Sequence, residues 1–311
     1  MKILKFFALV TMMAYLVGFA LPVPETLASD AMTLSEQLFF ATVRIETEKT
    51  DEQGKEVLEV GTGFVVEYAW DKNKKRYFLV TSKHVVKGAK MGRFFFLKAE
   101  NNKPVLGENY KVEIDLFESR WFLNKNPNID VAVMPLDVIL QKMKKRSWNI
   151  FFKSITENIS MNETNIKDLD AIEEIIFVGY PSGLYDLKNL LPIARRGITA
   201  TPLSVDYFGL PLFLIDASVF PGSSGSPVFI YNTGTFSVRE NIVMGNRLVF
   251  LGLILGVYTR EDLAGANVEA GARDLAPVIK TRQTINVGVV SKASTVFDTI
   301  REYLKTNGEI Q

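Results

Sequence analysis

The sequence predicts an all-β fold that carries a polar, partly helical insertion and ends in an α-helix. Short apolar runs, several of them alternating with polar residues, recur along the chain and are separated by Gly, Pro, Asn and Asp. This pattern is typical of strands joined by turns. Apolar residues make up 47% of the 311 residues, which is enough for a large buried core. Residues 137–171 break the pattern because they are rich in Lys, Asn and Glu.

The predicted strands are rich in Val, Ile, Phe and Tyr, which favour a pleated, half-buried surface. They cover residues 37–48, 57–68, 76–81, 93–98, 110–117, 129–136, 174–180, 193–200, 212–219, 228–231, 248–258 and 286–290. Within the insertion, residues 139–148 could form a helix. Residues 291–305 predict an amphipathic helix, because their apolar side chains recur on one face. These side chains are Ala293, Val296, Phe297, Ile300 and Leu304.

The N-terminus has the pattern of an export signal. Lysines open it, residues 6–21 carry no charge, and residues 26–28 place small side chains at the spacing that signal peptidase prefers. We therefore expect a signal peptide at 1–28, a mature domain at 29–311, and export to the periplasm or the extracellular medium. The alternative is an anchor in the membrane by residues 6–21, although this run is shorter than the roughly 20 residues of a spanning helix.

The composition excludes several kinds of function. The net charge is +1, so nothing indicates a nucleic-acid-binding surface. The chain has no cysteine, and therefore no disulfide and no Cys-based metal or redox site. It has one histidine, His84, whereas a zinc site needs two or more imidazoles or several carboxylates. We expect no metal and no cofactor.

Residues 219–228, Val-Phe-Pro-Gly-Ser-Ser-Gly-Ser-Pro-Val, connect two predicted strands. Because Gly, Ser and Pro are common turn residues, the segment can be a simple tight connection. It can also present a nucleophilic serine, since glycines let the backbone fold back and aim N–H groups at an oxygen that becomes negative. Ser224 has Gly222 two residues before it and Gly225 directly after it. The neighbouring serines lack this flanking, so Ser224 is the candidate nucleophile.

A serine nucleophile needs a base, usually an imidazole, and His84 is the one imidazole of the chain. It follows the predicted strand 76–81, where a scaffold can hold it over a cleft, although a lone histidine can also be structural. The imidazole in turn needs an orienting acid. Asp130 is the best candidate, because it opens an apolar strand where a carboxylate without a partner is costly to bury. A turn-forming role for Asp130 stays open, and Asp115 and Asp137 are weaker candidates.

Three blocks of sequence follow the order His, Asp, Ser. They are Phe-Leu-Val-Thr-Ser-Lys-His-Val-Val ending just after His84, Asp-Val-Ala-Val-Met-Pro-Leu from Asp130, and Asp-Ala-Ser-Val-Phe-Pro-Gly-Ser-Ser-Gly-Ser-Pro-Val around Ser224. Together they resemble the trypsin-like serine peptidases of the chymotrypsin fold, especially the cysteine-free bacterial branch that includes the HtrA proteases, and the order is that of chymotrypsin. Ser223 and Ser226 depart from the family, which often has Asn and Gly at these positions.

The resemblance implies an architecture of two packed six-stranded antiparallel β-barrels. The N-terminal barrel would cover about residues 38–136 and the C-terminal barrel about 172–290. The insertion at 137–171 would lie between them in sequence, and the helix at 291–305 would close the chain. No PDZ-like domain is expected after this helix.

The resemblance also implies roles for individual residues. Ser224 would attack the scissile carbonyl, His84 would accept its proton and return it to the leaving amine, and Asp130 would hold the imidazole tautomer. The N–H groups of Gly222 and Ser224 would form the oxyanion hole. Ser218 would lie at the base of the specificity pocket, where a neutral residue argues against a strong preference for Lys or Arg.

The substrate strand is expected to pair near Val257, Tyr258 and Thr259. The predicted function is an exported serine endopeptidase acting on a protein or peptide substrate. One alternative is a catalytically silent barrel of the same fold that binds peptides or partners. Another is an enzyme held inactive until the N-terminal segment or the insertion moves. No nucleic-acid partner is expected, and a membrane partner only if the N-terminal segment is retained.

Overall fold

The computed structural model describes residues 32–51, 53–239, 241–264 and 279–310. Its helices and strands lie within one unit, Leu34–Gln311. The signal peptide predicted at 1–28 and the anchor considered at 6–21 lie outside the described residues. Among the helices of the described part, none is long and apolar enough to cross a membrane.

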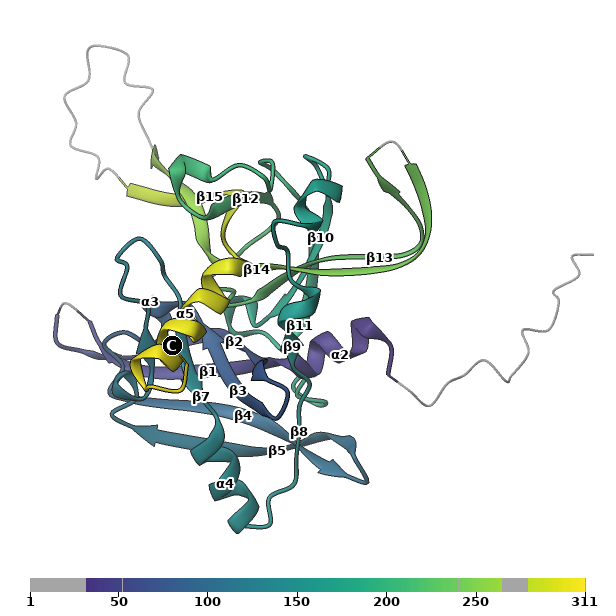
Figure 1. Ribbon diagram of the computed structural model, residues 1–311. Helices are drawn as coiled ribbons and strands as arrows, with labels where there is room; N and C mark the ends of the chain where they lie inside the picture. The colour runs from purple at the N-terminus through teal and green to yellow at the C-terminus, as the bar shows by residue number, and fades with distance from the viewer. Residues whose placement is uncertain (1–31, 52, 240, 265–278, 311) are drawn as a thin grey trace, which may run out of the picture. The chain divides into compact units, whose positions relative to one another are not determined.

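The first sheet has nine strands, and its main path runs in the order β5-β4-β1-β2-β3-β7-β6 (Figure 1). The strands of this path are β1 (Thr42–Thr50), β2 (Glu56–Asp71), β3 (Lys74–Thr81), β4 (Met91–Glu100), β5 (Lys103–Asp115), β6 (Phe122–Leu123) and β7 (Ala132–Pro135). Helix α2 (Leu34–Ala41) leads into β1, and the one-turn helix α3 (Lys83–Val86) follows β3. Neighbouring strands of the path are antiparallel.

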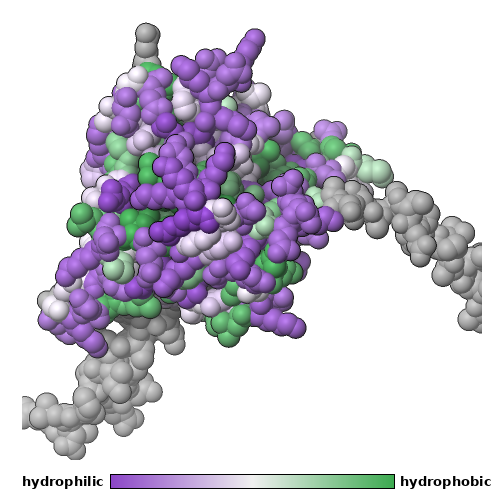
Figure 2. Space-filling model, turned by 90° about the horizontal axis from the view of Figure 1, so that it is seen from below, coloured by the Kyte–Doolittle hydropathy of each residue, from purple (hydrophilic) through white to green (hydrophobic). Residues whose placement is uncertain are grey.

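The polar segment 137–171 is attached to this first sheet. Its elements are α4 (Asp137–Lys145), β8 (Ile150–Phe151), β9 (Ile155–Thr156) and the 3-10 turns Glu157–Ile159 and Asn165–Asp168. Strand β8 pairs with β4, and β9 pairs with β2 in parallel. Helix α4 buries Ile139 and Met143 and carries lysines in its last turn. Hydrophilic residues predominate on the face seen from below, and hydrophobic residues form small, separate patches there (Figure 2).

The second sheet closes into a six-stranded antiparallel barrel in the order β10-β11-β12-β15-β14-β13. Its strands are β10 (Glu174–Gly179), β11 (Ile193–Thr199), β12 (Leu212–Asp216), β13 (Pro227–Val238), β14 (Asn241–Ala264) and β15 (Ile279–Lys292). Helix α5 (Ala293–Thr306) follows β15 directly. The predicted fold class is therefore confirmed, with two antiparallel sheets and a C-terminal helix. The first sheet has nine strands instead of six: seven lie on its main path, and the insertion adds β8 and β9.

Strands β13 and β14 are longer than the predicted strands at 228–231 and 248–258. Their pairing continues from Asn232 opposite Arg247 to Val238 opposite Asn241, and this part forms a two-stranded arm that leaves the barrel (Figure 1). The arm contains Gly234 opposite Gly245. Glycine weakens a strand pattern in sequence, which explains why the arm was not predicted.

A cluster of buried phenylalanines joins the two sheets beneath α5. The ring of Phe250 in β14 lies 5.4 Å from that of Phe64 in β2, 5.5 Å from Phe229 and 6.3 Å from Phe297 of α5, measured between centroids. Each of these side chains is at most 1% exposed, and burying one contributes about 1.5–3 kcal/mol. This packing fixes the first sheet against the second, and the candidate site lies where the two meet.

Candidate active site

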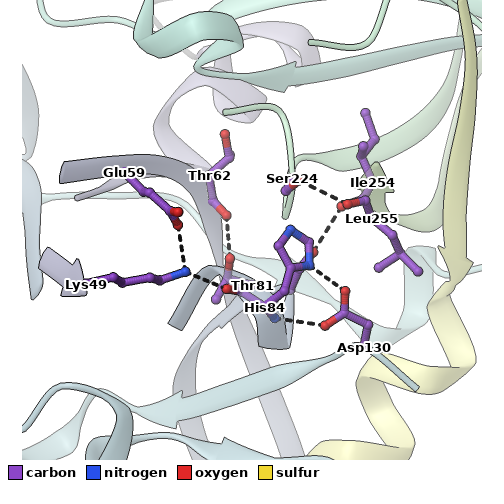
Figure 3. A network of polar contacts seen from close by, with 10 residues as sticks. Lys49, Glu59, Thr62, Thr81, His84, Asp130, Ser224, Ile254 and Leu255 are labelled. Carbon is purple, nitrogen blue, oxygen red and sulfur yellow. Dashed lines mark hydrogen bonds and ion pairs between the residues drawn. The ribbon is translucent and has the colours of Figure 1, made fainter. Parts of the chain in front are cut away.

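His84 lies in the one-turn helix α3, directly after β3. Val85 and Val86 of the same turn are buried in the first sheet, so the histidine is turned outward and 49% of its side chain is exposed. Lys49 Nζ donates to the backbone carbonyl of His84 at 2.7 Å and pairs with Glu59 (Figure 3). The ring is therefore accessible, while the backbone that carries it is fixed.

Asp130 holds both the ring and the backbone of His84. Its Oδ2 lies 2.5 Å from the ring Nδ1, and its Oδ1 accepts the backbone N–H of His84 at 2.9 Å (Figure 3). Because a carboxylate only accepts hydrogen bonds, a neutral ring donates through Nδ1 and keeps the lone pair of Nε2 free. Partial burial lowers the pKa of the neighbouring Lys83, and the attraction of Asp130 opposes this effect.

The two other candidate acids lie elsewhere. Asp137, at the start of α4, pairs with Arg76 Nε at 2.7 Å. Asp115 is exposed at the end of β5. Among the residues that the structure describes, only Asp130 of the three bonds to His84.

Ser224 lies in a tight turn between β12 and β13. Gly222 and Gly225 have φ angles of 88° and 86°, which glycine adopts without the steric cost of a Cβ atom. Inside the turn, the N–H of Ser226 donates to the carbonyl of Ser223 at 2.9 Å. The two glycines thus allow the chain to reverse and to present Ser224 between them.

The carbonyl of Ile254, in β14, accepts hydrogen bonds from both parts of the site. The N–H of Gly225 donates to it at 2.7 Å, and the hydroxyl of Ser82 donates to it at 3.1 Å. Ser82 lies two residues before His84, and Gly225 directly follows Ser224. One carbonyl of the second sheet therefore brings the candidate base and the candidate nucleophile to the same place.

The hydroxyl of Ser224 donates to the carbonyl of Leu255 at 3.0 Å (Figure 3). In the described part of the chain, no hydrogen bond joins this hydroxyl to the ring of His84. Figure 3 shows the ring between Asp130 and Ser224, with its second nitrogen on the side of Ser224. Such hydrogen bonds are often long or absent before substrate binds.

The two N–H groups predicted to bind an oxyanion belong to Gly222 and Ser224. Neither donates to an acceptor among the described residues. The adjacent carbonyls are held, since that of Pro221 accepts the N–H of Ser182 at 2.6 Å and that of Gly222 accepts the hydroxyl of Thr62 at 2.8 Å. Backbone donors without a partner are uncommon in folded proteins, so these two are available to a ligand.

A family model of the trypsin-like peptidase domain matches residues 61–236. This range covers more than half of the chain and includes His84, Asp130 and Ser224. The chain belongs to the family of trypsin-like peptidase domains. The predicted resemblance is therefore confirmed, and the family implies protein or peptide substrates. No curated protein matches the chain significantly.

Several solved structures are similar to this trypsin-like peptidase domain at low sequence identity. The active form of the Rv3671c protease from M. tuberculosis has 16% identity and a TM-score of 0.42, over 89% of this chain and 85% of that one. The HtrA-type protease AlgW with a tripeptide has 12% identity and a TM-score of 0.44, over 88% of this chain but 62% of AlgW. The scabies mite inactivated protease paralogue S-I1 has 12% identity and a TM-score of 0.44, over 86% and 97%.

In this trypsin-like peptidase domain, β14 contacts the turn that carries Ser224 (the serine turn, residues 221–226). It does so through Ile254 and Leu255, which precede the predicted substrate strand. Strand β13 pairs with β14 only as far as Leu253. After this residue, the edge of β14 on the side of β13 has no strand beside it in the described chain, whereas β15 pairs along the other edge. A Cβ atom built on Gly256 meets no atom within 4 Å, which shows open space on the face of β14 toward which this atom would point. From Leu255 onward, the edge of β14 on the side of β13 is therefore unpaired in the described chain.

The residues predicted to bind substrate take different positions. Val257 is partly buried and pairs with Gly288 of β15. Tyr258 is 39% exposed, and its hydroxyl donates to that of Tyr207 at 3.3 Å. The side chain of Thr259 lies outside the described residues. Ser218 is partly buried after β12, six residues before Ser224.

The polar residues that hold the site together carry little signal in the sequence. Ser82 has a weak signal in sequence, because it stands two residues before the histidine. Thr62 lies between two glycines at the start of an apolar run, but its partners are far along the chain. Among the described residues, no group of three His, Asp or Glu side chains is placed to hold a metal ion.

We predict that Gly225→Ala destabilises the domain more than Gly234→Ala. Both glycines have a φ near 80° to 90° (86° and 82°), so both substitutions cost roughly 1–2 kcal/mol for the left-handed backbone. A Cβ atom on Gly225 would also lie 2.0 Å from the carbonyl oxygen of Thr62, whereas one on Gly234 meets nothing within 4 Å. This overlap should add about 1–3 kcal/mol to the loss of stability in Gly225→Ala.

Urea unfolding of the two variants measures this difference. Equal free energies of unfolding would show that the turn is not packed against Thr62.

Proposed function

We propose that the protein is a serine endopeptidase in which Ser224, His84 and Asp130 form a catalytic triad. The observation that carries this proposal is the double contact of Asp130 with the ring and the backbone of His84. It fixes the imidazole beside a turn that carries Ser224 and two N–H groups without an acceptor among the described residues.

In the proposed reaction, Ser224 Oγ attacks the carbonyl carbon of the scissile bond while Nε2 of His84 takes the hydroxyl proton. The N–H groups of Gly222 and Ser224 bind the oxygen that becomes negative, which stabilises the tetrahedral intermediate. Asp130 stabilises the imidazolium ion. Nε2 then donates the proton to the leaving amine, and the C–N bond breaks to give an acyl-enzyme. Water, activated by His84, releases the acid and restores Ser224.

The hydrogen bond between Ser224 and Leu255 favours a second candidate, a domain that binds peptides without cleaving them or that is held inactive. The strength of this hydrogen bond decides between the enzyme and the second candidate. A neutral hydrogen bond contributes only about 0.5–1.5 kcal/mol net. A bound substrate can offset this amount, and rotation about the Cα–Cβ bond would then release the hydroxyl. We therefore favour the enzyme.

The substrate proposed is an extended peptide that adds to the free edge of β14 after Leu253. Strand addition supplies backbone hydrogen bonds without selecting side chains. Selection would come from a specificity pocket with Ser218 at its base. We also propose export of the protein, which is supported by the uncharged run at 6–21 and the small residues at 26–28.

We expect a fluorophosphonate probe to label the full chain at Ser224, and Ser224→Ala to abolish labelling and casein hydrolysis. The probe reacts only with a serine that is activated by a base. Mass spectrometry of the labelled peptide identifies the serine. Ser237→Ala, at an exposed serine of the arm, is the control and should label normally.

A folded wild-type protein that stays unlabelled would support the silent barrel. Labelling that begins only after limited proteolysis of the N-terminal segment or of residues 137–171 would support the enzyme held inactive.

We predict that Asp130→Asn lowers kcat by about 10⁴-fold. The amide would still accept the backbone N–H of His84, but its NH₂ group would face Nδ1. The ring would then carry its proton on Nε2 and could not act as a base. Asp115→Asn, at an exposed carboxylate that does not touch His84, should leave kcat unchanged. A loss below tenfold in Asp130→Asn, measured on a peptide ester, would remove Asp130 from the triad.

Cleavage of a peptide library should show no strong preference for Lys or Arg before the cleaved bond. The reason is that Ser218 offers no charge to a cationic side chain at the base of the pocket. Sequencing of the product termini measures the preference. A dominant Lys or Arg would mean that another residue forms the base.

A further inference from the structure

The side chains of the turn that carries Ser224 make only one hydrogen bond among the described residues, from the Ser224 hydroxyl to the carbonyl of Leu255. Gly222 and Gly225 have no side chain, and glycine loses more conformational freedom on folding than other residues. The hydroxyls of Ser223 and Ser226 are buried and have no hydrogen-bond partner in the described part of the chain. Besides its own backbone hydrogen bonds, the turn therefore depends on groups outside it.

Thr62 of β2 supplies two of these outside contacts. It is fully buried. Its N–H donates to the carbonyl of Ser224 at 2.9 Å, and its hydroxyl donates to the carbonyl of Gly222 at 2.8 Å. Its own carbonyl accepts the hydroxyl of Thr81 at 2.7 Å (Figure 3). One residue of the first sheet therefore binds the turn at two successive points, on either side of Ser223.

The direction of the Thr62 hydroxyl is determined by a third partner. The backbone N–H of Tyr180 donates to this hydroxyl at 3.1 Å, so the hydroxyl proton is directed to the carbonyl of Gly222. That carbonyl belongs to the peptide that joins Gly222 to Ser223. Along the backbone, this peptide lies between the N–H of Gly222 and the N–H of Ser224. Holding the plane of this peptide restricts ψ of Gly222 and φ of Ser223, two of the backbone dihedral angles that set how the two N–H groups are oriented relative to each other.

We propose that Thr62 is a positioning residue for the oxyanion hole, and that its hydroxyl sets the relative orientation of the Gly222 and Ser224 donors. The inference rests on the proposed function of these donors. Thr62 touches neither substrate nor reacting atoms. It acts through the peptide between Gly222 and Ser223, so its loss should weaken transition-state binding and leave ground-state binding nearly intact.

The test compares Thr62→Val, which keeps the shape and removes the hydroxyl, with Thr62→Ser, which keeps the hydroxyl. We expect Thr62→Val to lower kcat by about 10–100-fold, because a small misplacement of catalytic groups costs up to about 100-fold, with KM within about 3-fold of wild type. The inhibition constant of a peptide aldehyde, whose adduct carries an oxyanion, should rise in parallel with the loss of kcat. Thr62→Ser should retain kcat within about 3-fold.

Thr47→Val is the matched control. Thr47 lies in the neighbouring strand β1, is 1% exposed, and its hydroxyl has no partner in the described chain. Its substitution should leave kcat and aldehyde inhibition unchanged. All rates are normalised to active sites titrated with the fluorophosphonate, and thermal unfolding is recorded for each variant.

Several outcomes would overturn the inference. They are a wild-type kcat in Thr62→Val, an equal loss in Thr62→Ser, and a loss of kcat without a change in aldehyde inhibition. If Thr62→Val does not fold, Thr62→Ala is compared with Thr62→Ser by the same criteria. If the wild type cleaves substrate and Thr62→Val cleaves it equally fast, only the inference is contradicted. If the wild type folds but cleaves no substrate, the proposed function is contradicted as well.

Discussion

The arrangement of the site depends on two hydrogen bonds to one backbone carbonyl, that of Ile254. Ser82 donates from the first sheet and Gly225 donates from the serine turn. Each such bond contributes only about 0.5–1.5 kcal/mol net, which is less than the burial of one phenylalanine in the cluster around Phe250. Apolar packing therefore holds the two sheets together, and the polar contacts determine the register at which they meet. Catalytic geometry is sensitive to register, because a misplacement of about 1 Å can cost 100-fold in rate.

The serine turn concentrates features that cost stability. It has two glycines with positive φ, two backbone N–H groups without an acceptor in the described chain and two buried hydroxyls without a partner. A turn that paired its own donors would be more stable, but it would then have nothing to offer an oxyanion. Local conflicts of this kind are expected at functional sites. The contacts from Thr62, Ser182 and Ile254 offset the cost, since each pairs a carbonyl or N–H of the turn that chemistry does not need.

The fold class and the three candidate catalytic residues could be predicted from sequence because each has a local signal. His84 follows an apolar strand, Asp130 opens one, and Ser224 stands between glycines. The register of β14 could not be predicted, because its pairing with β15 is irregular between Ile254 and Gly256 and again between Val257 and Thr259. Such an irregularity changes which residue of β14 faces the serine turn but leaves no mark in the amino-acid composition of the strand. This explains why the contact of Leu255 with Ser224 could not be predicted.

The supports of the site were harder to predict for a related reason. The hydroxyl of Thr62 bonds to a carbonyl 160 residues away, and the hydroxyl of Ser82 to one 172 residues away. Such partners are determined by how the two sheets pack, and a single sequence carries no periodic pattern that reports it. Motifs therefore identify the groups that react, whereas only the packed structure identifies the groups that hold them.

Helix α5 also supports the site through contacts between residues that are far apart in the sequence. Its Phe297 packs on Phe250, and its Thr299 accepts a hydrogen bond from Asn124 Nδ2 at 2.7 Å. Asn124 lies in the segment that leads to Asp130, and its N–H also donates to the carbonyl of Val131. The helix thus contacts the aromatic cluster and the segment that carries the candidate acid. Asp130 comes from this segment and Ser224 from the barrel, so α5 contacts both parts of the chain that supply the candidate site. The C-terminal helix is therefore structural support for a site that it does not touch.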